Sequence, residues 1–74
     1  MNELILIDNN SREYIVKDPR IFYDHLIEFH TTNKLADNSV HEENGFYFTV
    51  TKDLFKKVEL FVLNYKNYPS QIYN

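Results

Sequence analysis

The 74-residue chain has 8 Lys and Arg against 11 Asp and Glu, a formal net charge of −3, and no cysteine. Its length fits a single domain, residues 1–74, and the lack of cysteine excludes disulfides and thiolate metal sites. The acidic balance disfavours a nucleic-acid partner, and no apolar run reaches the roughly 18 residues of a membrane span. With no signal peptide recognisable at the N-terminus, we expect a cytoplasmic or nuclear protein that binds neither membranes nor nucleic acid.

The first half of the chain predicts a hairpin followed by a helix. Two apolar strands, Leu4–Ile7 and Tyr14–Val16, flank the polar turn Asp8–Arg12 and should pair in antiparallel fashion. Asp18 and Pro19 then combine an N-cap residue with a proline suited to the first helical position. The helix should fade at 31–33, where two threonines and an asparagine follow one another.

The second half predicts a loop, a third strand and a long helix. Residues 37–45 are polar and include the chain's single glycine, so they predict a loop. The strand Phe46–Val50 follows, and Thr51 is a plausible N-cap for a helix that Pro69 should end. The expected fold class is therefore α+β, with a three-stranded sheet in ββαβα order.

The predicted last helix is apolar over more than half of its circumference. One stripe combines Leu54, Val58, Phe61, Val62 and Tyr65, and a second group contains Phe55, Leu60 and Leu63. A helix that buries one face does not need the second group, so further chain or another molecule should cover it. Six Tyr and six Phe in so short a chain also favour a partner interface, because the interior is too small for all twelve rings.

No residue pattern indicates catalysis, a metal or a cofactor. The histidines at positions 25, 30 and 41 do not form a His-Glu-x-x-His motif, because position 45 is glycine. His25 with Glu28, or His41 with the glutamates after it, could contribute ligands, but ordinary partly exposed histidines are the expectation. The serines lie in predicted loops and one glycine cannot form a phosphate-binding loop, so we expect no enzyme, no metal and no cofactor.

The segment order and two local motifs resemble the elongin C-like members of the BTB/POZ superfamily. Leu4 to Lys17 is similar to the family's first hairpin in length, turn position and the ending Glu-Tyr-Ile-Val-Lys. Phe46 to Tyr68 is similar to its third strand and the following helix. Family members continue into further helices where this chain stops at Asn74, which puts the family's helix-binding pocket in question.

The resemblance implies a minimal BTB/POZ-like fold and a non-catalytic adaptor role in cullin-RING ubiquitin ligase complexes. The implied partners are a cullin, a ubiquitin-like protein of the elongin B type, or a receptor with a box helix, and self-association is a further expectation. The acidic loop would approach the cullin, the first hairpin the ubiquitin-like protein, and the last helix the box helix. The implied partner-binding residues are Asp37, Glu42, Glu43, Leu60, Phe61, Leu63, Tyr65 and Tyr68.

Two alternatives come from other classes of protein. The first is a small inhibitor, viral or from a mobile element, that blocks a host protein through an acidic and aromatic surface. The second is nucleic-acid binding through the lysines of the last helix, since residues 51–74 hold four basic and two acidic residues while residues 1–50 hold four and nine. A solvated lysine face is the favoured interpretation, because the whole chain is acidic.

Overall fold

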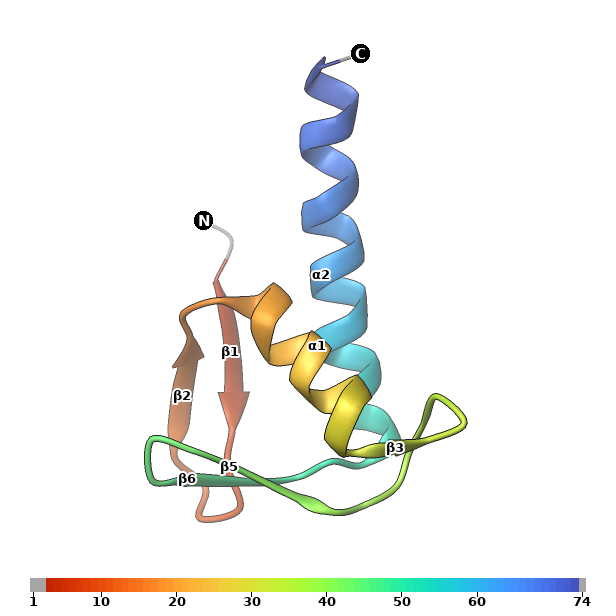
Figure 1. Cartoon of the computed structure of the whole chain (residues 1–74). Helices are drawn as coiled ribbons and strands as arrows, with labels where there is room; N and C mark the ends of the chain where they lie inside the picture. Colours follow the sequence, from red (N-terminus) through yellow and green to blue (C-terminus); the bar gives the residue numbers. More distant parts are fainter. Residues whose placement is uncertain (1–2, 74) are drawn as a thin grey trace.

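The computed structural model describes the backbone of residues 3–73 and the side chains of residues 3–64. Within these residues two helices and three antiparallel strand pairs form an α+β fold (Figure 1). In chain order the elements are β1 (Leu4–Ile7), β2 (Glu13–Val16), α1 (Pro19–Phe29), β3 (Thr31–Thr32), β4 (Leu35–Ala36), β5 (Val40–Glu43), β6 (Phe46–Thr49) and α2 (Lys52–Tyr73).

The predicted first hairpin is confirmed, and a single carboxylate organises its turn. Asp8 Oδ1 accepts the backbone N–H groups of Asn10 and Arg12 at 3.0 and 2.8 Å, while Oδ2 accepts from the Arg12 guanidinium at 2.7 Å. Burial raises the pKa of Asp8, but the hydrogen bonds with the Arg12 side chain and the two backbone N–H groups outweigh burial and lower it. This closed turn fixes the register that pairs Ile5 with Ile15.

The predicted start of the first helix agrees with the structure, and its end lies before the predicted 31–33, because Thr31–Thr32 form β3. Asp18 caps α1 by accepting the backbone N–H of Ile21 at 3.2 Å, and Pro19 occupies the first turn. The helix ends at Phe29, where His30 donates its backbone N–H to the Leu26 carbonyl at 2.8 Å. Phe22 and Leu26 are the fully buried apolar residues of α1, and they direct one face of the helix into the core.

The prediction of a loop at 37–45 was wrong for its central part, because β5 occupies residues 40–43. Asn44 and Gly45 have φ values of +53° and +83°, the left-handed pair of a two-residue hairpin turn. That turn folds β6 directly back onto β5 and pairs Glu43 with Phe46. The β3–β4 pair forms in the same way around two further residues with positive φ.

The predicted three-stranded sheet and ββαβα order are not confirmed. The strands form three separate two-stranded pairs, β1–β2, β3–β4 and β5–β6, within the described residues. The strand at 46–49 takes β5 as its partner instead of the first hairpin, since the two-residue turn makes β5 the neighbour with the shortest loop to close. The backbone hydrogen bond from Asn9 N to Tyr47 O, 2.7 Å long, still joins the first hairpin to β6.

Helix α2 starts where the sequence predicts and runs further than predicted. Thr51 Oγ1 accepts the backbone N–H of Leu54 at 3.1 Å, and Asp53 lies in the first turn, where the helix dipole favours an acidic side chain. The predicted end at Pro69 was wrong, because the helical backbone continues to Tyr73. A proline removes one backbone N–H and strains the preceding turn, but the hydrogen bonds on either side can persist.

The core lies between the two helices, the first hairpin and β6. In Figure 1 the β1–β2 hairpin stands beside α1, and the β5–β6 hairpin passes below the end of α1 and the start of α2. The C-terminal half of the α2 backbone extends beyond the other elements in the same view. Among the residues whose side chains are described, nine apolar ones form the buried cluster: Leu4, Leu6, Val16, Phe22, Leu26, Phe48, Val50, Val58 and Val62.

Candidate functional site

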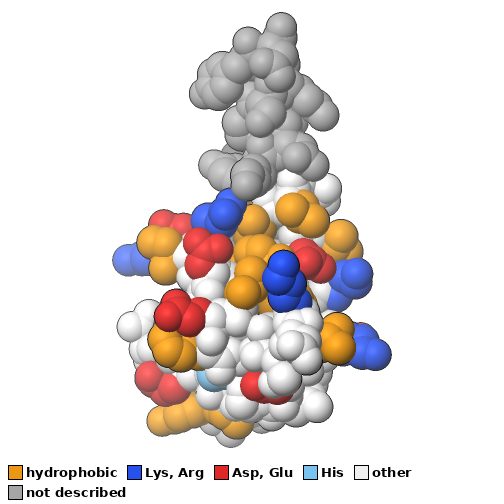
Figure 2. All heavy atoms as spheres, turned by 45° about the vertical axis from the view of Figure 1, so that its right-hand side comes forward, with side chains coloured by type: hydrophobic (Ala, Val, Ile, Leu, Met, Phe, Trp, Pro, Cys, Tyr) orange, Lys and Arg blue, Asp and Glu red, His pale blue; other side chains and the backbone are white. Residues whose placement is uncertain are grey.

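The surface of α2 contains two apolar residues that nothing covers within the described part of the chain. Val58 and Val62 face the core, whereas Leu60 and Leu63 expose 51% and 43% of their surface. They are three residues apart and so share one side of the helix. Figure 2 shows hydrophobic side chains just below the grey end of the chain, with charged side chains among them.

The other residues predicted on this helix have different positions. Phe61 is half-buried and packs against the core cluster. Phe55, which the sequence placed with the uncovered group, is partly buried, and its ring lies 5.6 Å from that of Tyr23. The side chains of Tyr65 and Tyr68 lie outside the described residues, although both positions belong to α2.

Helix α1 fixes the base of α2. The Tyr23 hydroxyl donates to Glu59 Oε2 at 2.9 Å, next to the Tyr23–Phe55 ring contact. Burial first, and then the hydrogen bond to Glu59, raise the pKa of Tyr23, so its hydroxyl keeps its proton at neutral pH. Leu60 and Leu63 therefore belong to a helix that is held in place by a buried face and by a polar contact.

The outer face of the first hairpin is a second apolar surface. Ile5 and Ile15 are opposite each other on β1 and β2, and Ile7 lies on the same face two residues along. All three are exposed, while Leu4 and Leu6 point inward to the core. The strand Leu4–Ile7 is apolar on both faces, and the structure covers one of them.

The three predicted acidic residues make contacts inside the chain. Asp37 Oδ1 accepts the Ser39 hydroxyl at 2.5 Å, and Glu42 Oε2 accepts the backbone N–H of Gly45 at 2.8 Å. Hydrogen bonds from the side chain and backbone of Ser39 lower the pKa of Asp37. Contact between these residues and a cullin stays a prediction.

Glu43 lies between a tyrosine and a histidine. Its Oε2 accepts the Tyr14 hydroxyl at 2.8 Å and its Oε1 is 2.9 Å from His41 Nε2. Asn44 donates to the Tyr14 oxygen at 2.8 Å, so this oxygen both accepts and donates. Burial and the bond to Glu43 raise the pKa of Tyr14. The carboxylate of Glu43 is therefore an acceptor for two ring side chains.

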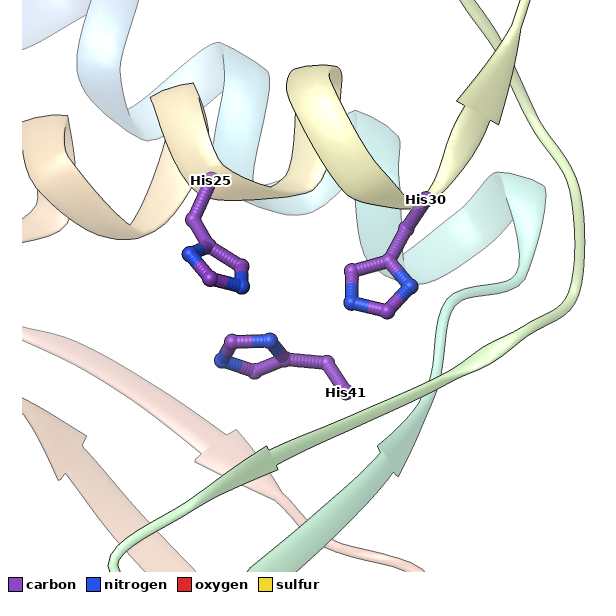
Figure 3. A group of neighbouring side chains, drawn as sticks. All are labelled: His25, His30 and His41. Atoms are coloured by element: carbon purple, nitrogen blue, oxygen red, sulfur yellow. The ribbon is translucent and has the colours of Figure 1, made fainter.

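The structure also brings together the three histidines of the chain. His25 on α1, His30 at the end of α1 and His41 on β5 each offer a ring nitrogen, and these nitrogens lie within 4.8 Å of one another. Figure 3 shows the three rings facing a common space from the helix and from the strand below it. His41 is buried, His30 is nearly so, and His25 is exposed, so the cluster opens to solvent on the α1 side.

The sequence reasoning missed this cluster because two of its members share no local motif with the third. His25 and His30 are five residues apart near the end of a helix. His41 comes later in the chain, in a segment that the sequence predicted to be a loop and that forms β5. The signal that could have found it is the Asn44-Gly45 turn, which makes 40–43 a strand and puts His41 on the face that points inward.

Comparison with models of protein families, with curated proteins and with solved structures found no match for this chain. Among the residues searched, neither helix is long and apolar enough to cross a membrane.

Proposed function

We propose that this chain is a non-catalytic protein-binding module whose docking surface lies on α2. The observation that carries the proposal is the pair Leu60 and Leu63, which are exposed on a helix whose opposite face is already buried in the core. The backbone of this helix also extends beyond the rest of the fold (Figure 1). An exposed apolar side on a projecting helix is typical of a surface that a partner covers.

The occupant that fits this surface is an amphipathic helix from another protein. Side chains three and four residues apart form ridges along a helix, and a second helix packs its own ridges between them. Leu60 and Leu63 provide the start of such a ridge, and the 22-residue length of α2 gives a partner helix several turns to follow. Helix-on-helix docking through a few apolar anchors is a common mode of peptide recognition.

Charge further defines the partner. Lys56 and Lys57 are exposed one turn before Leu60, and Lys52 is exposed at the start of the helix. A partner helix with acidic residues beside its apolar stripe would therefore meet basic side chains at the rim. Rim charges of this kind set orientation and association rate more than affinity.

The finer form of the proposal is the adaptor role implied by the resemblance to elongin C-like proteins. Two features support the adaptor role: a first hairpin that ends in Glu13–Lys17, and a last helix with an uncovered apolar side. In that form α2 receives the box helix of a receptor, and the isoleucines of the first hairpin face a ubiquitin-like protein of the elongin B type. Cullin contact would involve the 37–43 region.

The test is affinity capture with the full chain as bait, comparing three forms. Wild type is compared with the double variant Leu60→Asp/Leu63→Asp and with Leu35→Asp, which places the same charge on an exposed leucine of β4. Partners that are captured by wild type and Leu35→Asp but lost with the double variant support docking on α2. Circular dichroism of each bait checks that it is folded.

Two outcomes would contradict the proposal at different levels. If the double variant captures the same proteins as wild type, the docking surface is not on α2. If the selectively lost partners include no cullin, no elongin B-type protein and no box receptor, the adaptor form is wrong and the binding module remains. Direct titration of purified elongin B with the chain checks the adaptor form independently.

A further inference from the structure

The three histidines form the one group within the described residues whose side chains are arranged as ligands. Their ring nitrogens lie within 4.8 Å of one another, although the histidines come from α1 with its C-terminal end and from β5. Imidazole is a good ligand for zinc and for other transition metals, and three of them with an open fourth position form a common zinc site. If the three rings were packed together only by chance, their nitrogens would have no preferred direction. The hydrogen bonds around the cluster therefore distinguish a metal site from chance packing.

The hydrogen bonds of His30 define which of its nitrogens is free. The Ser39 hydroxyl has one proton, and it donates that proton to Asp37 Oδ1 at 2.5 Å. At the 2.6 Å contact with His30 Nδ1 the Ser39 oxygen is therefore the acceptor, and His30 Nδ1 carries the hydrogen. In the neutral ring this leaves the lone pair on Nε2.

His41 is oriented in the same manner by a different carboxylate. Glu43 already accepts the Tyr14 hydroxyl, which keeps it in place beside the ring. The 2.9 Å contact between Glu43 Oε1 and His41 Nε2 makes Nε2 the donor. The lone pair of neutral His41 is then on Nδ1, and in Figure 3 a nitrogen of each ring points toward the space between the three. Histidine ligands of metals usually have such a second partner, which fixes the tautomer and raises the basicity of the ligand.

From this arrangement we propose a binding site for a zinc-like divalent cation, with His25, His30 Nε2 and His41 Nδ1 as ligands. Zn–N distances of about 2.0–2.1 Å put the nitrogens of a tetrahedral site about 3.3 Å apart, so the 4.8 Å cluster must close slightly. His25 is exposed and its ring packs 4.6 Å from the Phe29 ring, and no hydrogen bond among the described residues holds it against this movement. Water takes the fourth position on the exposed side.

The three ligands come from two parts of the fold, His25 and His30 from α1 and its C-terminal end, and His41 from β5. Neutral imidazole is the form that binds metal. Bound zinc would join α1 to the β5–β6 hairpin and so stabilise the fold.

The test uses the full chain without a histidine tag, stripped of metal with EDTA and then dialysed. Thermal unfolding is recorded with and without ZnCl2, and calorimetric titration gives the stoichiometry. We expect one zinc per chain and a rise in Tm of about 10 °C or more at zinc concentrations near 100 times the Kd. Added EDTA should reverse the rise, and Co²⁺ in place of zinc should give the visible absorption of a tetrahedral complex.

Two matched variants on α1 make the result specific. His25→Ala removes an exposed ligand, so the metal-free protein should unfold within a few degrees of wild type while zinc binding weakens at least tenfold. Asp24→Ala removes the neighbouring carboxylate, which pairs with Arg20 and is not part of the cluster, and should leave zinc binding unchanged. The proposal is overturned if wild type shows no zinc-dependent shift, or if His25→Ala binds zinc as wild type does.

Discussion

The turn at Asn44 and Gly45 forms the β5–β6 hairpin, which was not predicted from the sequence. Replacing Gly45 with alanine tests how much the conformation of this turn contributes to stability. Gly45 has a φ of +83°, and a Cβ built there meets no atom within 4 Å. Alanine therefore causes no clash, and its whole effect comes from the backbone conformation. The affected hairpin holds His41 and Glu43 in place, so the change also acts on the histidine cluster.

The expected loss of stability follows from two opposing terms. An L-residue in the left-handed region costs about 1–2 kcal/mol. Alanine also restricts the unfolded chain, which stabilises the folded state by about 0.4–1 kcal/mol. The net loss is about 1 kcal/mol, which is about a fifth to a third of the roughly 3–5 kcal/mol that one small hydrophobic core supplies. In thermal unfolding this corresponds to a fall in Tm of about 4–8 °C.

The assay is thermal and urea unfolding of the Gly45→Ala variant, followed by circular dichroism. A chemically synthesised chain with D-alanine at position 45 is the matched control, since a D-residue favours positive φ. It adds the same methyl group and should be as stable as wild type or slightly more stable. Equal stability of the L- and D-alanine forms would refute the reasoning, because it would mean that residue 45 is not held in the left-handed region.

Three further predictions concern the core, the first turn and the histidine cluster. Leu26→Ala should destabilise the fold by about 3 kcal/mol in urea unfolding. Ile21→Ala, on the exposed side of α1, should destabilise it by less than about 0.5 kcal/mol. Similar losses for the two variants would mean that α1 buries a different face. Although burial raises the pKa of Asp8, its hydrogen bonds lower it below the ordinary 3.8, so the folded state holds this proton less tightly than the unfolded chain. The stabilisation is full above about pH 3.8 and is lost as the pH falls through the lower, folded-state pKa, so Asp8→Asn should reduce the fall in Tm between pH 5 and 2.5. Glu43→Gln should weaken zinc binding about 10- to 100-fold in calorimetric titration, whereas Glu42→Gln, on the opposite face of β5, should not change it.

The parts of the fold that could be predicted are those with local chemical signals. Asp18 followed by proline marks the start of α1, and Thr51 marks the start of α2, because each cap satisfies backbone N–H groups that the helix leaves free. The first hairpin could be predicted because the polar turn Asp8–Arg12 separates two short apolar runs. In each case the information lies within a few residues of the element.

The strand β5 could not be recognised from its pattern because that pattern is inverted. Val40 is exposed and His41 is buried, the opposite of what their hydropathy predicts. His41 tolerates burial because Glu43 satisfies one nitrogen and the Phe22 ring packs against it at 4.9 Å. Contacts made by α1 and by the hairpin turn therefore decide the structure of this segment. The turn can be read from Asn44 and Gly45, which follow the strand, whereas the contacts with α1 cannot be read from the sequence.

Of the two candidate sites, one could be predicted from a local pattern and the other could not. Leu60 and Leu63 were predicted as uncovered because helical periodicity alone assigns them to a different face from Val58 and Val62. The histidine cluster requires two elements to be placed against each other, which periodicity cannot supply. Asp37 and Glu43 were predicted as an acidic surface for a partner, and the structure has both as acceptors in the hydrogen bonds that orient His30 and His41.

The small hydrophobic core of the described residues gives a physical reason for both a metal and a partner. One core of this size rarely supplies more than about 3–5 kcal/mol, and isolated two-stranded hairpins are marginal in water. The described residues form three such hairpins, and the sequence has no cysteine to connect them. Zinc at the histidines would fix the β5–β6 hairpin to α1, and the contact between Tyr23 and Glu59 already fixes α1 to α2. A contact that stabilises the position of α1 therefore also stabilises the base of α2, the helix that presents Leu60 and Leu63. Zinc binding and partner binding would thus both stabilise the same pair of helices.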